Sequence, residues 1–344
     1  MGGFVLLPSF IIVPILLLLL GLVSLILCSV LIKVAPKDAP DGVRKEQRFA
    51  VPTSGGLAIA GTVLLVTATG WFPLPESPAF AILYGSMLLI GALDDVKSVG
   101  AKPKMLTMAL VALFCASFGI SSNLVFLPLA DSILPLPMWL AIGGSALWLF
   151  VFINATNFMD GSNGLAMGTL AIMLCSLSVR FFQIPEPEGY TLSLILVAAI
   201  LGFLFWNLQG KLYAGDAGSL FGGAVFASLG IYAAQDGNIW FPATLALPFL
   251  VDVFMTLLWR ARRGHNLLTP RRHHAYQLFI RSGWVHIKTA LLWWALATIC
   301  AVAGLWAASE SKSMSAWVFL GLLVAGCALW IAQRRHFRTL AENG

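Results

Sequence analysis

The stretch from Phe4 to Ile32 reads FVLLPSFIIVPILLLLLGLVSLILCSVLI and contains no charged side chain. A helix that crosses a bilayer needs about 20 consecutive apolar residues, so this stretch is long enough to cross a membrane. It has no charged segment before it and no small-residue cleavage site, unlike a signal peptide that is removed. We therefore expect a retained membrane helix at the start of the chain.

Similar apolar runs recur along the whole chain, which is 59% hydrophobic and only 10% charged, against about 25% charged residues in soluble domains. The runs are continuous rather than alternating, which favours membrane helices over a β-barrel. We predict an all-α polytopic membrane protein, with residues 1–344 forming a single integral-membrane domain in a bundle of about 11 transmembrane helices. The predicted spans are roughly 4–32, 53–72, 78–93, 104–120, 138–158, 165–183, 190–208, 218–235, 240–259, 285–307 and 314–333. The stretch 121–137 is interpreted as an interfacial loop.

Basic residues are distributed unevenly over the predicted loops. With eleven spans and the N-terminus outside, every lysine and arginine except Arg180 and Lys312 falls on the inner side, as the positive-inside rule requires. We therefore predict a periplasmic N-terminus and a cytoplasmic C-terminus. The net charge of +6 follows from this distribution, so we expect no nucleic-acid partner.

Four polar clusters stand at the ends of predicted spans, all on the predicted cytoplasmic face. They are Asp94-Asp95, the run 154–164 (NATNFMDGSNG), the run 215–219 (GDAGS) and the run 271–277 (RRHHAYQ). Acids, amides, glycines, histidines and arginines gathered at one face indicate a site for an anionic substrate and a metal ion. We therefore place the active site on the cytoplasmic face.

Carboxylates stand at two of these helix ends. Asp94 and Asp95 end the third predicted span, and adjacent helical side chains point about 100° apart, so one can face a site while the other contacts a neighbour. Asp216 opens the eighth span, where free N–H groups and the helix dipole also favour phosphate. A solvated helix end or an N-cap is the plainer explanation, but a cap requires neither Gly215 nor Gly218.

The run 154–164 carries amides and a carboxylate on one helix face, because Asn154, Asn157 and Asp160 are three residues apart. Gly161 and Gly164 permit a tight turn and close approach of the backbone to a ligand. Helix termination alone accounts for one or two of these residues. We interpret the run as a source of oxygen ligands and hydrogen-bond donors.

The loop at about 260–288 combines arginines, which fit phosphate oxygens in a bidentate fork, with histidines that can donate to phosphate. Tyr276 could stack on a base or a sugar. A positive-inside loop touching anionic lipid explains the arginines but not the run His273-His274-Ala275-Tyr276-Gln277. Asp252, about two turns inside the ninth span, either pairs with a loop arginine or has a substrate role.

Together the four clusters resemble the polyprenyl-phosphate N-acetylhexosamine-1-phosphate transferases, of the glycosyltransferase 4 type. The similarity extends from Asp94 to Gln277 in the order of that family's motifs, and the runs 157–166 (NFMDGSNGLA) and 215–219 are its specific signatures. The resemblance implies a bundle of ten or eleven helices in the bacterial inner membrane. Its active site would lie on the cytoplasmic face.

The resemblance also implies a reaction, in which undecaprenyl phosphate in the membrane attacks the β-phosphate of a UDP-amino sugar and releases UMP. Mg²⁺ is the implied cofactor, with Mn²⁺ as a substitute, and a homodimer is left open. The catalytic residues are then Asp94, Asp95, Asp160 and Asp216, with the metal held by Asp216, Asp94 and Asp160. The predicted substrate-binding residues are Asn157, Asn163, Lys104, Arg271, Arg272, His273, His274 and Tyr276.

The chain differs from the peptidoglycan branch of this family at two places. Asn163 stands where that branch has a second aspartate, and the histidine run is shorter than in that branch. We therefore favour an enzyme that starts O-antigen or another surface polysaccharide, with GlcNAc or a 6-deoxy sugar such as FucNAc or QuiNAc. The alternatives are a peptidoglycan phospho-MurNAc-pentapeptide transferase and a transporter of an anionic nucleotide or lipid. Transport is disfavoured because transporter sites lie near the bilayer midplane.

Overall fold

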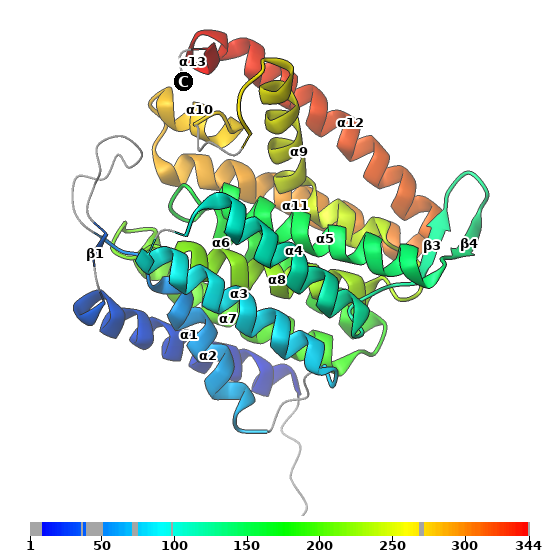
Figure 1. The fold of residues 1–344 in the computed structure, drawn as a ribbon. Helices are drawn as coiled ribbons and strands as arrows, with labels where there is room; N and C mark the ends of the chain where they lie inside the picture. Colours follow the sequence, from blue (N-terminus) through cyan, green and yellow to red (C-terminus); the bar gives the residue numbers. More distant parts are fainter. Residues whose placement is uncertain are drawn as a thin grey trace, which may run out of the picture.

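The computed structural model describes residues 9–35, 37–38, 51–70, 75–97, 99–267 and 272–342. Most of this part of the chain is helical (Figure 1). In chain order the helices are α1 (Ser9–Val34), α2 (Gly55–Thr67), α3 (Pro78–Lys97), α4 (Ala101–Ser117), α5 (Met138–Met159), α6 (Leu165–Gln183), α7 (Pro187–Asn207), α8 (Gly215–Ala233), α9 (Trp240–Arg262), α10 (Ala275–Arg281), α11 (His286–Glu310), α12 (Lys312–His336) and α13 (Arg338–Glu342). Two short antiparallel hairpins pair β1 (Lys37–Asp38) with β2 (Val51–Pro52) and β3 (Leu124–Leu127) with β4 (Ser132–Pro135).

A helix occupies each of the eleven ranges predicted as spans. Within the described residues, 8 helices are long and apolar enough to cross a membrane, which confirms a polytopic helical membrane protein. The helices α2, α4 and α8 are not among them, so the predicted count of eleven spans and the orientation remain predictions.

Helix α8 lies inside the bundle, in contact with α2, α3, α5, α6, α7 and α9 (Figure 1). Its sequence, GDAGSLFGGAVFASLGIYA, is rich in small residues, and nearly all of its side chains are buried. Small side chains let neighbouring helices approach closely. A helix covered by protein rather than lipid does not need strongly apolar side chains. This explains why α8 is less apolar than the helices that qualify as membrane spans.

The close approach of α3 to α8 positions the first carboxylate cluster. Gly91 of α3 leaves no room for a side chain, because a Cβ there would meet the backbone of Asp216 and Ala217. Asp94 and Asp95 follow Gly91 by about one helical turn. The contact therefore brings both carboxylates of α3 to the N-terminus of α8.

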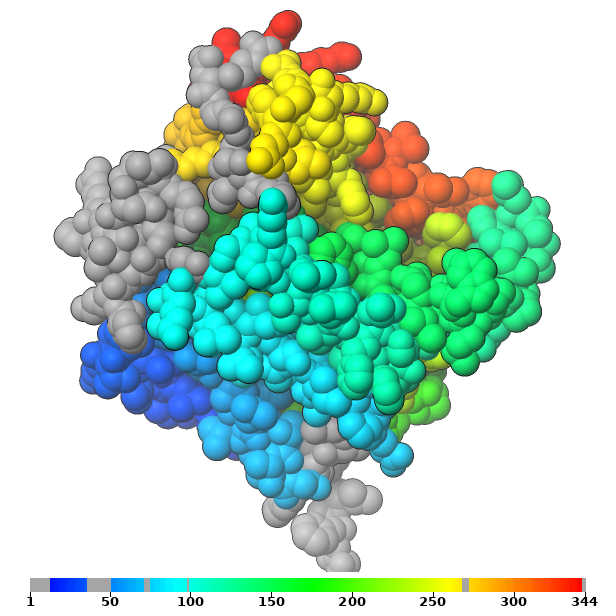
Figure 2. All heavy atoms as spheres, viewed as in Figure 1, coloured from blue at the N-terminus to red at the C-terminus, as the bar shows by residue number. Residues whose placement is uncertain are grey.

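The outer surface of the bundle carries many large apolar side chains. Leu18 of α1 is 74% exposed, Trp139 of α5 is 73% exposed and Phe182 of α6 is 76% exposed. An apolar surface of this kind would promote association in water and fits contact with lipid. In the face shown by Figure 2, the atoms of α3 and α4 lie in the centre, and the yellow atoms at the end of α9 adjoin them.

The stretch 121–137 forms no span, as predicted, but the β3–β4 hairpin within it was not foreseen. The hairpin projects from the edge of the bundle (Figure 1).

The two basic residues predicted to lie on the outer face are Arg180 and Lys312. Both contact Asp236, at 3.6 and 3.5 Å. Asp236 follows the C-terminal end of α8, whereas Asp216 lies in its first turn, so these charges are at opposite ends of the bundle.

Candidate active site

The first part of the site is an ion-paired cluster built from α3, α4 and α8. The Lys104 Nζ lies 2.9 Å from the Asp94 Oδ2, and the same ammonium group contacts the Asp216 Oδ2. Lys104 therefore bridges two carboxylates that are 122 positions apart in the sequence. The second oxygen of Asp94, Oδ1, is buried and accepts no hydrogen bond from the described residues.

Asp95 has a different role from its neighbour. Its two carboxylate oxygens accept hydrogen bonds from the backbone N–H groups of Asp216, at 2.9 Å, and Ala217, at 3.1 Å. These are two of the N–H groups that a helix leaves unpaired at its N-terminus. Asp95 thus fixes α3 to α8, while Asp94 faces Lys104, as the 100° separation of adjacent helical side chains suggested.

The run 154–164 supplies the next contacts. The Asn157 Nδ2 donates to the Asp216 Oδ1 and to the Ser219 Oγ, both at 2.9 Å, so the end of α5 joins the carboxylate cluster. Asp160 follows α5 directly, and burial together with the negative charges of Asp216 and Asp95 raises its pKa well above the usual range. Asn154 does not take part, because its Nδ2 donates to the Phe150 carbonyl of its own helix.

The turn between α5 and α6 is held by a residue that the sequence did not reveal. Gly164 has φ +76°, a conformation that favours glycine, and its N–H donates to the Asn207 Oδ1 at 2.6 Å. The Nδ2 of Asn207 donates in turn to the Leu212 carbonyl, just before α8. Asn207 is buried at the end of α7 within an apolar run, so no motif pointed to it.

Two further residues of the run 154–164 lie in the turn between α5 and α6. The Ser162 Oγ lies 2.9 Å from the His286 Nδ1, and Asn163 is half-buried.

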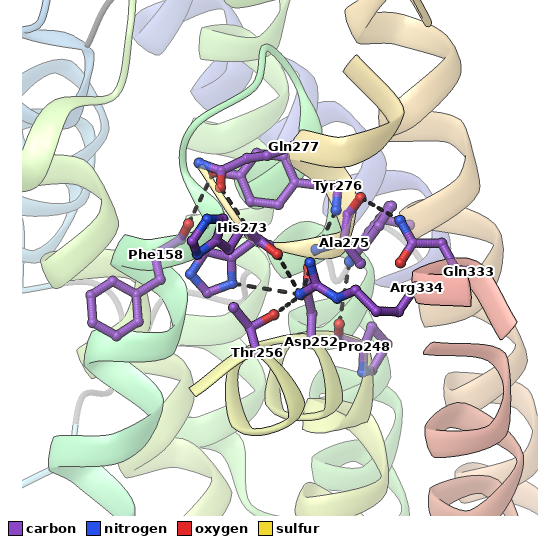
Figure 3. Close-up of polar contacts among 12 residues, drawn as sticks. Phe158, Pro248, Asp252, Thr256, His273, Ala275, Tyr276, Gln277, Gln333 and Arg334 are labelled. Atoms are coloured by element: carbon purple, nitrogen blue, oxygen red, sulfur yellow. Dashed lines mark hydrogen bonds and ion pairs between the residues drawn. The ribbon is translucent and has the colours of Figure 1, made fainter. Parts of the chain in front are cut away.

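The second part of the site is the histidine segment, residues 273–277 (HHAYQ), which runs into the short helix α10 (Figure 3). Asp252 of α9 lies beneath it: its Oδ1 accepts from the Ala275 N–H at 2.7 Å, and its Oδ2 accepts from the Tyr276 N–H at 3.4 Å. The His274 Nδ1 lies 3.6 Å from the Asp252 Oδ1. The structure therefore assigns Asp252 to holding this segment, a role that the sequence left open.

Tyr276 links the two parts of the site. Its hydroxyl donates to the Phe158 carbonyl at 3.1 Å (Figure 3). Phe158 lies in the last turn of α5, next to Asn157 and two residues before Asp160. The Tyr276 ring is only 1% exposed, which favours a role in holding the turn over stacking on a substrate, and burial raises the pKa of its hydroxyl. His273 and His274 are also buried, and the His274 ring stacks between Phe158 and Tyr276.

The remaining predicted substrate contacts are the two arginines of the loop. Arg271 lies outside the described residues. Arg272 is half-buried, and its carbonyl accepts a hydrogen bond from the Arg281 Nη1 at 3.2 Å. The sequence did not indicate Gln333 and Arg334 of α12, which donate to the carbonyls of Ala275 and His273.

The predicted three-carboxylate metal set is not assembled: among the described residues, no group of three or more His, Cys, Asp or Glu side chains is placed to hold a metal. The Lys104 ammonium contacts both Asp94 and Asp216. These two residues nevertheless fit a smaller site. Mg²⁺ is usually held by one or two carboxylates together with substrate phosphates, and the Asp94 Oδ1 is a buried oxygen with no hydrogen-bond donor among the described residues.

A helical bundle with lipid-facing surfaces and a polar, carboxylate-rich site at one end is the architecture of a multi-pass membrane enzyme. Residues 78–234 match the model of glycosyl transferase family 4. This match agrees with the motifs and confirms the family resemblance that they indicated.

Curated relatives agree with this assignment. The chain is 28% identical over 310 residues to a "probable undecaprenyl-phosphate N-acetylglucosaminyl 1-phosphate transferase" of Bacillus subtilis, a match that covers 88% of this chain and 84% of the relative. It is 27% identical over 283 residues to the phospho-N-acetylmuramoyl-pentapeptide-transferase of Staphylococcus haemolyticus, covering 76% of this chain and 86% of the relative. With its apolar helices, these similarities identify a multi-pass protein of the bacterial inner membrane.

Proposed function

We propose that this chain transfers an N-acetylhexosamine-1-phosphate from a UDP-sugar to undecaprenyl phosphate and releases UMP. The observation that carries the proposal is the bridge from Asp94 through Lys104 to Asp216, which Asn157 joins. It brings three of the four polar clusters and one further lysine into direct contact at one end of the bundle. The relatives named above carry out reactions of this class according to their names.

In the proposed reaction, an oxygen of the lipid phosphate attacks the β-phosphorus of the UDP-sugar. A new P–O bond forms, the bond from the β-phosphorus to the bridging oxygen breaks, and UMP leaves with that electron pair. A phosphate monoester has a second pKa of about 6, so the attacking phosphate is largely dianionic near neutral pH. The site therefore has to position two anions and offset their repulsion rather than supply a strong base.

The residues of the cluster divide these tasks. Asp94 has the buried, unpartnered oxygen, and with Asp216 it would hold Mg²⁺, which when bound neutralises charge on the diphosphate and on the departing UMP. Lys104 is placed to donate to phosphate oxygens in a charge-assisted hydrogen bond. Asp95 keeps α3 against α8 through two backbone hydrogen bonds.

The same contacts favour direct attack over a covalent enzyme intermediate. Both oxygens of Asp95 already accept backbone hydrogen bonds, and Asp94 is paired with Lys104. Asp95 would have to break one of these contacts to act as a nucleophile, and the free oxygen of Asp94 is the one proposed to hold the metal. Isolation of a phosphorylated enzyme after incubation with the UDP-sugar alone would contradict direct attack.

We further propose that the helices in all eleven predicted spans cross the membrane, with the N-terminus periplasmic and both the site and the C-terminus cytoplasmic. The chain then acts as one domain on a nucleotide sugar of the cytoplasm. Asn163 and the short histidine segment favour an initiating enzyme of O-antigen or another surface polysaccharide, acting on UDP-GlcNAc or a 6-deoxy amino sugar. The Bacillus subtilis relative, named for N-acetylglucosamine, supports the first of these donors.

The test is UMP release by the purified protein in detergent with undecaprenyl phosphate and Mg²⁺. UDP-GlcNAc, UDP-FucNAc, UDP-QuiNAc and UDP-MurNAc-pentapeptide are supplied one at a time. We expect lipid-dependent release with one of the first three donors, and loss of release with EDTA. Absence of release with every donor from folded protein would contradict the proposal, and uptake of nucleotide sugar into vesicles would then support the transport alternative.

The staphylococcal relatives favour one second candidate, because they are named for phospho-N-acetylmuramoyl-pentapeptide transfer. Release of UMP with UDP-MurNAc-pentapeptide alone would establish that candidate. The same assay thus distinguishes the two donors without further variants.

A further inference from the structure

The C-terminal end of α12 contacts the backbone of the histidine segment. The Arg334 Nη2 donates to the His273 carbonyl at 2.6 Å, and the Gln333 Nε2 donates to the Ala275 carbonyl at 3.1 Å (Figure 3). Helix α12 also packs along α9 and α11. It lies outside residues 78–234, which match the family model.

Arg334 is buried, which is unusual for a charged residue. Its guanidinium lies between the indole rings of Trp259 and Trp330, at 4.4 and 4.5 Å from their centroids, and the residue is 7% exposed. An arginine stacked on aromatic faces is stabilised by cation–π attraction. The negative charge of Asp252 also attracts it. An arginine that bound lipid headgroups would be exposed, as the neighbouring Arg335 is.

The contacts from α12 complement those from α9. Asp252 accepts from the N–H groups of Ala275 and Tyr276, while α12 donates to the carbonyls of His273 and Ala275. The backbone groups of His273, Ala275 and Tyr276 are thereby held from two helices. Beyond this segment, the Tyr276 hydroxyl donates to the Phe158 carbonyl, and the adjacent Asn157 donates to Asp216.

We infer that Arg334 is a positioning residue of the nucleotide-sugar site. Through the His273 carbonyl it fixes the histidine segment, and through Tyr276 it fixes the end of α5, which carries Asn157 and leads into Asp160. The inference rests on the proposed function for the identity of the ligand. Arg334 itself touches no reacting group in this arrangement. Its effect is on the orientation of other residues, and small displacements of such residues are costly for a reaction that depends on alignment.

The test compares Arg334→Met with Arg335→Met, which removes the same charge one residue further along but from an exposed position. Hydrogen exchange is measured in the substrate-free protein over residues 273–281. We expect faster exchange of the Ala275 and Tyr276 amides in Arg334→Met and wild-type exchange in Arg335→Met. Wild-type protection in Arg334→Met, or an equal loss in both variants, would overturn the inference.

The second readout is functional. In Arg334→Met we expect the KM for the UDP-sugar to rise and UMP binding to weaken by about tenfold to a hundredfold, with the KM for undecaprenyl phosphate unchanged. A purely structural role would instead lower kcat in proportion to the loss of folded protein, with no selective change in KM, and that result would contradict the inference. If wild type transfers no sugar, the exchange experiment still tests the contact, so the two failures are distinguishable.

Two further variants cover the case in which Arg334→Met does not fold. Gln333→Leu removes only the bond to the Ala275 carbonyl, and we expect faster exchange of the same segment, to a smaller degree. Arg334→Lys keeps a cation between the indoles but loses the planar fork of donors, so it should restore folding and only part of the nucleotide affinity. Full nucleotide affinity and full amide protection in both variants would overturn the inference.

Discussion

The carboxylate cluster and the histidine segment are held in opposite ways. In the cluster, charged side chains contact one another: Lys104 lies between Asp94 and Asp216, and an oxygen of Asp94 remains without a hydrogen-bond donor among the described residues. In the histidine segment, buried side chains bond to backbone groups instead, as Asp252 and Arg334 do. The carboxylate cluster has charged groups that can bind a ligand. In the histidine segment, the side chains of Asp252, Gln333 and Arg334 bind the backbone of the segment itself. This difference assigns chemistry to the cluster and geometry to the segment.

If the carboxylate cluster carries the chemistry, the largest loss of activity is expected from a substitution of Asp216. In Asp216→Asn, Lys104 loses one of its two anionic partners and the site loses a metal-binding oxygen, so we expect transfer activity to fall about 10³-fold. UMP release measures the loss. Asp236→Asn, at the opposite end of α8, removes the same charge and should retain activity. Equal losses in both variants would show that the cluster has no special role.

Lys104→Met tests whether Lys104 compensates the carboxylates. Without the ammonium group, Asp94 and Asp216 repel each other, so metal-free protein should melt at a lower temperature than wild type. Added Mg²⁺ should restore more of the melting temperature in the variant than in wild type, while activity falls about a hundredfold. Thermal unfolding in EDTA and in Mg²⁺ measures both effects. A variant whose melting temperature is insensitive to Mg²⁺ would contradict a metal held by these carboxylates.

Asp252→Asn should produce a smaller loss, mainly through geometry. The amide can present its NH₂ group to the Ala275 N–H, which would leave a buried donor unsatisfied at a cost of about 1–3 kcal/mol. We expect lower thermal stability and a higher KM for the UDP-sugar. The Mg²⁺ concentration needed for half-maximal activity should not change. A shift in that concentration would place Asp252 in the metal site instead.

Tyr276→Phe distinguishes the two roles that Tyr276 could have. The variant loses the hydrogen bond to the Phe158 carbonyl but keeps the ring, so a positioning role predicts a loss of about 1 kcal/mol in unfolding free energy with a modest rise in KM. Denaturation of the purified variant measures the first effect. Wild-type stability and KM in this variant would favour a ring that stacks on the substrate.

Asp160 gives the smallest expected effect, on the pH dependence of stability. Because its pKa is raised in the folded protein, the folded state binds a proton more tightly than the unfolded chain does. Stability should therefore decrease as the pH rises from about 4, the unfolded value, through the raised folded value. Asp160→Asn should make this slope shallower. An unchanged slope in the variant would show that Asp160 is not the group responsible.

Continuous apolar runs were sufficient to predict eleven helices, because each membrane helix must satisfy its own backbone within one segment. The short helices α10 and α13 lie outside these runs and were not predicted. The grouping of the carboxylates was also predictable, because the topology derived from the basic residues placed all of these helix ends on one membrane face. Helix α8 has a low hydropathy for a span because its many glycines and alanines allow close packing against neighbouring helices. This close packing could not be predicted from the length and hydropathy of the span.

The residues that hold the site were not predictable in the same way. Asn207 and Arg334 act through hydrogen bonds to backbone groups outside their own helices, and neither lies in a motif. The partner of each is fixed by tertiary packing, of α7 against α6 and of α12 against α9. The role of Asp252 was open for the same reason, and the hairpin at β3 and β4 depends on pairing that apolar periodicity does not reveal.

The most direct test of the proposed transfer follows the phosphate itself. UDP-GlcNAc and the other candidate donors, each labelled with ³²P at the β-phosphate, are incubated with the purified protein, Mg²⁺ and undecaprenyl phosphate, and the lipid is extracted. We predict that with one donor the label enters the lipid in equal amounts with released UMP, and that Asp216→Asn abolishes both. Label that remains water-soluble with every donor while UMP is released would mean hydrolysis rather than transfer, and would contradict the proposed function.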